Sequence, residues 1–586
     1  MMLPMPSRKA SENWNSKLGV ILAVAGSAIG FGNFLRFPGL AAQYGGGAFM
    51  IAYFTAFLLL GIPLSWVEWT LGRRGGVYGA HSTASIFYQI THSHAWKYLG
   101  IFAVLAPLSI SMYYMYLEGW TLGYAYHMAA GDLNLSSTEE FSAFFSRFVG
   151  ASHNGAVFEP GQSTLLIFFA LALLLNLYLV YRGVTKGIEW FCKWSIPVLL
   201  LTAIIVMVRV LTLGTPDATH PERNVNEGLG YMWNPAKTML VTVSEQDGVR
   251  METTVNMVPH TATPEQRREI IARTQEAYPQ ARVEERRISL GRSLMNPQLW
   301  ITAAGQIFFS LSIGFGTICT YASYVPRGHD IALGSLTANA ANEVVEVGIA
   351  GMMIVPATVS LLGVAAAAGA STFGLGFNVL PQVFAGMPGG QFFGTLFFAL
   401  LSLAAVTSSI SLLQPAMAFM EEFWNLRRTQ STTLVALLMT GGALIVSWFT
   451  GDGMMALDTM DFWIGTMFLY IITTMYLVIF RFIWGTKNGL RELQRGALLP
   501  IPRALGFVLN WVTPLILFAI FASWVYQNAF VTLCPQIRNI LNAEPGALVP
   551  LAWVFLTGVF MAFVVRTSRY LHKRKLEKQS DRIPIS

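Results

Sequence analysis

Long apolar stretches constrain this chain more than any other feature of its sequence. Stretches of roughly 18 or more residues, enough for a helix to cross a bilayer, occur about twelve times. They begin near Leu18, Phe49, Trp96, Thr164, Trp190, Leu299, Leu336, Phe392, Thr432, Phe462, Leu505 and Leu548. Because 54% of the residues are hydrophobic and only 12% are charged, the composition lies far outside that of soluble proteins. The chain is predicted to be an all-α polytopic protein embedded in a lipid bilayer.

Basic residues predict how the spans are oriented, because positive charge collects in cytoplasmic connections. In this chain they fall in alternate connections, at Arg8, Lys9, Lys17, Arg73, Arg74, Arg182, Lys186, Arg427, Arg428, Lys487, Arg491 and 573–575. An even number of spans places both termini on one side, which is therefore predicted to be the cytoplasmic face of the cell membrane. This bias accounts for the net charge of +7, so no nucleic-acid partner is expected.

A repeated tetrapeptide marks two of the apolar stretches. Ile-Gly-Phe-Gly occurs at 29–32 and again at 313–316, each time in the middle of a segment that should otherwise be a continuous membrane helix. Paired glycines allow a helix to unwind, and unwound backbone at this depth is tolerated only inside protein or along a cavity. Corresponding broken helices in two halves of a chain indicate the substrate and ion site of a secondary transporter.

The two broken helices divide the chain into repeats. Each opens a set of five spans, and since five is odd the second set must enter the membrane in the opposite sense, giving a 5+5 inverted repeat. The last two spans, after about Pro500, have no counterpart and are predicted to be accessory. The expected parts are a cytoplasmic tail (1–17), a first repeat (18–216), an extracellular insertion (217–296), a second repeat (297–485), two accessory helices (486–568) and a basic cytoplasmic tail (569–586).

The insertion is charged and polar, and it is too long for a simple loop. Asp247-Gly248 between alternating apolar residues predicts a hairpin. Thr263, followed by Pro264 and Gln266, has the pattern of a capping box that begins a helix. With a last strand near 282–290, the insertion is predicted to be a small β-β-α-β lid. We expect a solvated structure without a ligand, although an extracellular partner stays open.

Five longer motifs then resemble one known family. They are AGSAIGFGNFLRFP at 25–38, GGGAF at 45–49, GQIFF at 305–309, TYASYV at 320–325 and DTMDFW at 458–463. Together they resemble the neurotransmitter:sodium symporter family, and the similarity runs from about Trp14 to Phe530 apart from the insertion. The resemblance implies a secondary active transporter rather than an enzyme, with Na⁺, in two sites, as its coupling ion.

The resemblance implies both sodium sites residue by residue. Oxygen ligands would come from unwound backbone and from hydroxyl and amide side chains. The first site would use the Ala28 carbonyl, Asn33, Ser310 and Asn342, with the substrate carboxylate as a further ligand. The second would use the Gly26, Ile29 and Ala404 carbonyls with the hydroxyls of Thr407 and Ser408.

The resemblance also implies that the substrate is a neutral amino acid. Relatives for carboxylate-free monoamines carry an aspartate where this chain has Gly30, so here the substrate should bring its own carboxylate. The implied pocket is mostly apolar: Ala28, Gly30, Phe31, Gly32, Ile110, Tyr114, Phe309, Ser310, Ser312, Phe315, Ser408 and Leu412. Phe31 departs from the usual leucine and would either narrow the pocket or stack an aromatic substrate; the sequence does not decide which.

Glu346 stands four residues after Asn342, on the same helical face, and near Tyr53, Gln306 and Ser310 by resemblance. In chloride-dependent relatives a serine occupies this position and chloride supplies the negative charge. A carboxylate here predicts transport without chloride, and its protonation after sodium release would allow proton counter-transport.

The resemblance places two gates. Arg36 and Asp461 would form the outer gate pair. The inner gate would include Trp14, Ser323, Tyr324 and Glu422, the last in place of the usual aspartate. Ser11 stands where an arginine is expected, so the cation of the inner gate is left to Arg8 or Lys9.

Taken together, the sequence predicts a sodium-coupled, chloride-independent symporter of a neutral, hydrophobic amino acid. Two other functions remain open. One is a sodium-dependent amino-acid receptor on the transporter fold, which would bind without accumulating its ligand. The other is a carrier of betaine-like osmolytes, for which Phe31, Phe309 and Phe315 would form an aromatic cage. A homodimer also stays open.

Overall fold

A computed structural model describes residues 14–161, 163–246, 249–259, 262–531 and 533–580. Within these residues nine helices are long and apolar enough to cross a membrane. They are Gly47–Gly76, His94–Ala130, Val184–Leu211, Ile331–Leu362, Gly390–Trp424, Arg428–Trp448, Gly453–Ile483, Ala504–Val531 and Pro545–Ser568. A bent pair, Lys17–Ala28 with Gly32–Gln43, adds a further span, and the shorter helix α9 (Leu165–Tyr181) is also apolar. With the second broken helix, these helices account for all of the predicted apolar stretches.

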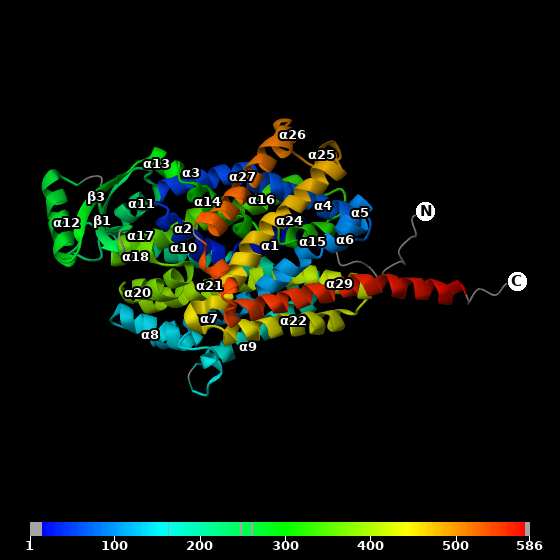
Figure 1. The fold of residues 1–586 in the computed structure, drawn as a ribbon, viewed down its shortest axis with the longest axis horizontal. Coiled ribbons are helices and arrows are strands. Elements are labelled where there is room, and N and C mark those ends of the chain that lie inside the picture. The colour runs from blue at the N-terminus through cyan, green and yellow to red at the C-terminus, as the bar shows by residue number, and fades with distance from the viewer. Residues whose placement is uncertain (1–13, 162, 247–248, 260–261, 532, 581–586) are drawn as a thin grey trace.

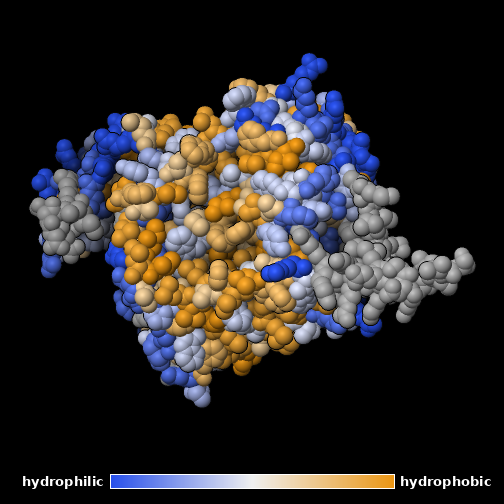
Figure 2. All heavy atoms as spheres, turned by 45° about the vertical axis from the view of Figure 1, so that its right-hand side comes forward, coloured by the Kyte–Doolittle hydropathy of each residue, from blue (hydrophilic) through white to orange (hydrophobic). Residues whose placement is uncertain are grey.

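The surface of the molecule is divided into an apolar middle and hydrophilic ends. Figure 2 shows apolar side chains over the middle of one face and hydrophilic side chains gathered toward its two ends. The small sheet and α12 lie at one end, and α29 (Pro545–Ser580) extends at the opposite end (Figure 1). An apolar belt between two polar ends is the surface that a bilayer requires.

The first broken helix has the predicted interruption. Helix α1 (Lys17–Ala28) stops before the tetrapeptide, and a π-helical turn η1 (Gly32–Arg36) leads into α2 (Phe37–Gln43), bent by 47° from α1. We expected the glycines here to supply unusual backbone angles, but neither Gly30 nor Gly32 has a positive φ. A Cβ on Gly30 would lie 2.8 Å from the Tyr114 hydroxyl, so this glycine is needed for close packing.

The second break is longer than the first. Helix α14 (Pro297–Ser310) and α15 (Thr317–Ser323) are separated by a turn that starts before the tetrapeptide. Ser312, Gly314 and Gly316 have φ of 55°, 85° and 70° within it, so backbone freedom does matter at this copy. The freed Gly314 amide donates to Glu68 Oε1 of α4 (Ile62–Gly76) at 2.6 Å. A buried carboxylate that the sequence reasoning did not single out therefore holds the break.

The insertion has the predicted β-β-α-β order. Its elements are β1 (Lys237–Gln246), β2 (Val249–Val258), α12 (Pro264–Ala277) and β3 (Arg282–Ile288), in an antiparallel sheet ordered β2-β1-β3. The capping box of Thr263 and Gln266 is present, with both hydrogen bonds formed. The predicted hairpin turn at 247–248 lies outside the described residues.

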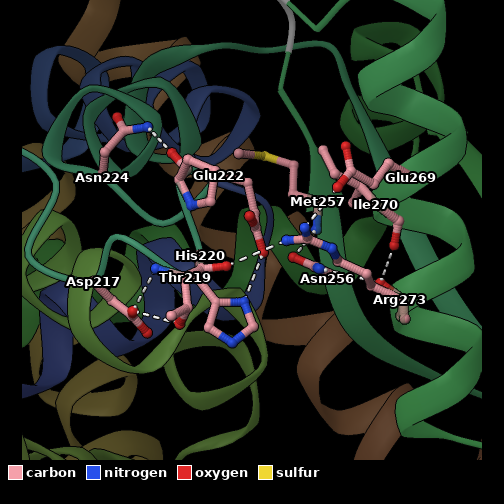
Figure 3. A network of polar contacts seen from close by, with 12 residues as sticks. Asp217, Thr219, His220, Glu222, Asn224, Asn256, Met257, Glu269, Ile270 and Arg273 are labelled. Carbon is pink, nitrogen blue, oxygen red and sulfur yellow. Dashed lines mark hydrogen bonds and ion pairs between the residues drawn. The ribbon is translucent and has the colours of Figure 1, made fainter.

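Side-chain contacts attach the insertion to the membrane helices. A short helix α11 (Val225–Trp233) precedes β1, and its Tyr231 hydroxyl donates to the Ala42 carbonyl of α2 at 2.6 Å. Arg273 of α12 donates to the Thr219 carbonyl at 3.2 Å and to Glu269 at 2.6 Å (Figure 3). The Tyr231 contact thus joins the insertion to the end of the first broken helix, whereas the contacts of Arg273 lie within the insertion.

Lys237 at the start of β1 should make the stability of the insertion depend on pH. Its ammonium donates to the Tyr231 carbonyl and lies 4.2 Å from the centroid of the Tyr231 ring, and burial lowers its pKa to about 7. In the unfolded chain the pKa is near 10.4, so the unfolded state binds more protons between these values and stability rises with pH, by about 1.4 kcal/mol per unit at most. The protection factors of the β1 amides, which compare their exchange with the intrinsic base-catalysed rate, should therefore rise between pH 7 and 9.

Lys237→Met is the matched variant for this measurement, because it keeps the length of the side chain and removes the charge. Its β1 amides should be protected equally at pH 7 and pH 9. Equal pH dependence in the variant and the unmodified protein would show that Lys237 is not the group responsible.

Candidate functional site

A small cavity lies where the two broken helices meet α7 (Phe102–Ala130) and α21 (Gly390–Trp424). Its lining residues are Ser27, Ala28, Gly30, Phe31, Gly32, Ile110, Tyr114, Phe309, Ser312, Phe315, Ser408 and Leu412. Every residue predicted for the substrate pocket is therefore brought together here except Ser310, which lies in the adjacent polar cluster. The lining has no ionisable side chain except the Tyr114 phenol, so the cavity suits an apolar side chain.

Aromatic rings form most of the cavity wall. The Phe31 ring lies against Tyr114, with centroids 4.6 Å apart and planes tilted by 40°. Phe309 and Phe315 pack edge to face with centroids 5.9 Å apart. The Phe31 amide donates to the Tyr114 hydroxyl at 3.4 Å. Because the Phe31 ring packs on the Tyr114 ring, the cavity has a flat aromatic wall on this side.

Ser27 belongs to the cavity although the sequence reasoning missed it. Its carbonyl accepts from the hydroxyls of Ser312 and Ser408, each at 3.1 Å. In an intact helix this carbonyl would accept from the amide of residue 31, which instead bonds Tyr114. The signal that could have found Ser27 is its position in the last turn before the break.

The side chains predicted for the first sodium site form one buried cluster. Asn33 Nδ2 donates to Asn342 Oδ1 at 2.8 Å, and Asn342 Nδ2 donates to Ser310 Oγ at 2.7 Å. The Gly30 amide donates to Asn33 Oδ1 at 2.9 Å. Asn33 and Asn342 are fully buried, and Ser310 is only 1% exposed. Three oxygen-bearing side chains from three helices thus converge beside the cavity.

Glu346 joins this cluster. It lies in the π-helical segment η5 (Val344–Gly351) and accepts from Gln306 at 2.6 Å, Asn33 at 3.1 Å and Asn342 at 3.2 Å. The Ser310 hydroxyl also donates to it. The predicted neighbourhood is therefore found, and Tyr53 belongs to it, because its hydroxyl donates to Glu343 at 3.1 Å and also interacts with Glu346. Glu343, a second acid one turn earlier, was not foreseen.

The residues predicted for the second sodium site lie where α1 packs on α21. A Cβ on Gly26 would be 3.3 Å from the Thr407 Cβ, so the two backbones approach closely. The Thr407 hydroxyl donates to the Ala404 carbonyl at 3.0 Å, within its own helix. Ser408 bridges to α1 through the Ser27 carbonyl. Ile29, the other predicted ligand, is the residue at which α1 ends.

The predicted outer gate residues do not form an ion pair with each other in the part of the chain that the structure describes. The Arg36 guanidinium lies 4.9 Å from the centroid of the Phe309 ring, and its Nη1 is buried without a hydrogen bond. Asp461 accepts from the Tyr113 hydroxyl at 3.0 Å. Arg36 thus contacts Phe309, which lines the cavity, and Asp461 contacts Tyr113, the neighbour in sequence of the lining residue Tyr114.

The predicted inner gate residues are all buried or half-buried. The Trp14 indole donates to the Tyr321 carbonyl at 3.1 Å and meets its ring edge on. Ser323 and Tyr324 contact His81, and Glu422 accepts from Ser82, two residues that the sequence reasoning did not consider. Arg8, Lys9 and Ser11 lie outside the described residues.

A further buried acid lies next to the residues predicted for the second sodium site. Glu118 of α7 accepts from the Asn176 amide of α9 at 2.8 Å, and Asn176 accepts from the Ser409 hydroxyl at 2.6 Å. Carboxylates inside a membrane protein are functional by default, which is the signal that could have drawn attention to both Glu118 and Glu68. Ser409 adjoins Ser408, so this chain of hydrogen bonds positions that part of α21.

Comparisons with known proteins agree with this geometry. A sequence profile described as the Sodium:neurotransmitter symporter family matches residues 11–141 and 289–533, leaving out the insertion. A sodium-dependent transporter of Haemophilus influenzae is 26% identical over 533 residues, covering 88% of this chain and 99% of that one. A sodium- and chloride-dependent transporter of Mus musculus, XTRP3A, is 26% identical over 320 residues, 54% of this chain and 44% of its own.

Among solved structures, the chain is similar to the crystal structure of MhsT in complex with L-phenylalanine. The TM-score is 0.67 at 26% sequence identity, over 88% of this chain and all of that one. The predicted fold, with two discontinuous helices in a repeated bundle and a small insertion, is confirmed by this likeness and by the helices described above.

Proposed function

Because this chain belongs to the sodium:neurotransmitter symporter family, whose members are sodium-dependent transporters and not enzymes, we propose that it imports a neutral, hydrophobic amino acid by alternating access, without chloride. The observation that carries the proposal is the cavity at the two helix breaks. It is lined by apolar and aromatic groups, and Gly30 replaces the aspartate expected for a monoamine.

The substrate is proposed to bind with its α-carboxylate near the first break and its side chain toward Phe31, Phe309 and Phe315. The amides of Gly30 and Phe31 already donate to Asn33 and Tyr114, so they are not free to bind the carboxylate. The carboxylate would therefore be held by the Tyr114 hydroxyl and by a sodium ion. An aromatic guest is supported by the L-phenylalanine bound in the related MhsT structure.

Two sodium ions are proposed as the coupling ions. The first would be held by Asn33, Ser310, Asn342 and the Ala28 carbonyl. The three side chains are already close together, because Asn33 is hydrogen-bonded to Asn342 and Asn342 to Ser310. The second would be held between α1 and α21 by the Gly26, Ile29 and Ala404 carbonyls and the hydroxyls of Thr407 and Ser408. The proposal of two sodium ions rests on the family resemblance and on these two sets of oxygen-bearing groups.

We propose that both termini are cytoplasmic and that the insertion lies outside, with the chain divided into repeats as expected. In this orientation an inward sodium gradient drives import of the substrate. Two sodium ions entering with a zwitterion would gain about 4.6 kcal/mol from 100 mV and about 2.8 kcal/mol from two tenfold gradients. At full coupling this drives roughly 10⁵-fold accumulation, so uptake should be easy to detect.

The experiment is uptake of labelled amino acids into liposomes that hold the purified protein. An inward sodium gradient in chloride-free medium should drive accumulation of phenylalanine or leucine above equilibrium, and potassium should not replace sodium. Sodium-dependent binding without accumulation would favour a receptor. Accumulation of betaine rather than amino acids would favour the osmolyte carrier, and loss of uptake without chloride would contradict the proposed role of Glu346.

A further inference from the structure

At the inner gate, Ser11 stands at the position where the resemblance implies an arginine. In the resemblance this arginine pairs with an acid of α21, which here is Glu422. Glu422 Oε2 instead accepts from the Ser82 amide at 3.0 Å and from the Ser82 hydroxyl at 2.7 Å. Its Oε1 is buried and has no hydrogen-bond partner among the described residues. The carboxylate is thus bound to the loop 77–82 that joins α4 to α5 (Thr83–Thr91).

The residue before Ser82 connects the same loop to the second broken helix. His81 Nδ1 lies 2.9 Å from Ser323 Oγ, and its ring stacks on Tyr324 with centroids 4.4 Å apart and planes only 8° from parallel. The Ser323 hydroxyl donates to the Thr320 carbonyl at 2.6 Å. Since that hydroxyl has one proton, His81 must donate from Nδ1, so its tautomer follows from the network.

These contacts join three helices, α15, α21 and α1. Ser323 ends α15, the inner half of the second broken helix, and the loop carrying His81 is bound by Glu422 to the long helix α21. Trp14, just before α1, donates to the Tyr321 carbonyl of the same α15. The start of α1 is therefore held by α15, and α15 is held by His81. His81 is only 9% exposed, so it is a packed part of the closed inner side.

We infer that His81 and Ser82 replace the missing arginine as the partner of the α21 acid, and that His81 is the latch which keeps the inner half-helices closed. His81 is a positioning residue, since it does not line the cavity or contact a proposed ion ligand. The inference rests on the proposed alternating-access function. Opening toward the inside would break the contacts of His81 with Ser323 and Tyr324 while Glu422 keeps the loop on α21.

A native cysteine reports this opening. Cys192 of α10 (Trp190–Leu211) is fully buried beneath α1, with its sulfur 3.2 Å from the position of a Cβ on Gly26. It can react with a thiol reagent only when α1 moves away. Cys534 lies near the start of α28 (Pro535–Leu541), outside these contacts, and serves as an internal reference.

The test is the rate at which a small cationic methanethiosulfonate modifies each cysteine, followed by peptide mass spectrometry. His81→Ala removes the hydrogen bond to Ser323 and the stack on Tyr324, which together should raise the rate at Cys192 about tenfold while leaving Cys534 unchanged. His81→Phe keeps the stack and should give a smaller rise. His92→Asn, at the exposed far end of α5, is the matched control and should react like the unmodified protein.

The outcomes separate a latch from general loosening. A Cys192 rate in His81→Ala within twofold of the unmodified protein would overturn the inference, as would an equal rise at Cys192 and Cys534. If His81→Ala does not elute as a folded protein, the Cys192 and Cys534 rates of His81→Phe are compared with those of the unmodified protein in the same way. Uptake by the unmodified protein is measured alongside: its absence would count against the proposed function, whereas uptake with no effect of His81 would count against the latch alone.

Discussion

Glu346→Ser should convert the protein into a chloride-requiring transporter. The Glu346 carboxylate is fully buried and accepts hydrogen bonds from Asn33, Gln306 and Asn342, two of which are proposed to surround the first sodium ion. Removing the carboxylate that accepts from both of these asparagines takes away the negative charge beside the ion. Losing one partner of a buried charge pair costs about 3 to 5 kcal/mol, so chloride-free uptake should fall at least about 100-fold.

Chloride should restore uptake by this variant, because the serine side chain leaves room for an anion where the carboxylate was. The measurement is sodium-driven uptake at increasing chloride with gluconate as the replacement anion. Glu118→Gln is the matched control, since Glu118 is another fully buried carboxylate of a membrane helix, but its hydrogen bond goes to Asn176 and not to Asn33 or Asn342. It should stay independent of chloride. Undiminished chloride-free uptake by Glu346→Ser would show that this carboxylate does not balance the ion.

Gly30→Ala should weaken substrate binding about 100-fold. A Cβ at this position would lie 2.8 Å from the Tyr114 hydroxyl and 3.2 Å from the Ser408 hydroxyl, both of which line the cavity. Neither neighbour moves freely, because Tyr114 accepts from the Phe31 amide and Ser408 donates to the Ser27 carbonyl. Overpacking of this kind costs about 1 to 3 kcal/mol, and displaced polar groups add to it, so affinity should fall about 100-fold.

The control for this variant is Gly334→Ala in α16 (Ile331–Glu343), where a Cβ would meet nothing within 4 Å. It should bind substrate normally and gain slightly in helix stability. Binding of a labelled amino acid in sodium buffer, with thermal unfolding in parallel, distinguishes a blocked site from a misfolded protein. Affinity of Gly30→Ala within threefold of the unmodified protein would mean that the substrate does not approach this backbone.

Several parts of the structure follow from local sequence. The spans are visible as apolar length, and the capping box of Thr263 and Gln266 requires only residues three apart. The positions of both helix breaks were also predictable, since each contains a Gly-x-Gly pair in an apolar segment. These features depend on neighbours along the chain, and so their physical causes are present in the sequence itself.

The composition of the site was available only through resemblance. Asn33 and Asn342 are separated by 309 residues, and no periodicity relates two positions so far apart. The motifs placed them correctly beside Ser310 and Glu346. Their role as sodium ligands remains a prediction, as do the substrate contacts and both gates.

The sequence by itself determined that the chain is a membrane protein with two interrupted helices and a polar insertion. Only the tertiary structure decided that Tyr53 bonds Glu343, that the Ser27 carbonyl lies at the cavity, and that Glu422 and His81 hold the loop 77–82 against α21 and α15. These choices depend on how each helix is rotated about its axis and on which polar group a break leaves without a partner. Such quantities are set by packing across the whole bundle.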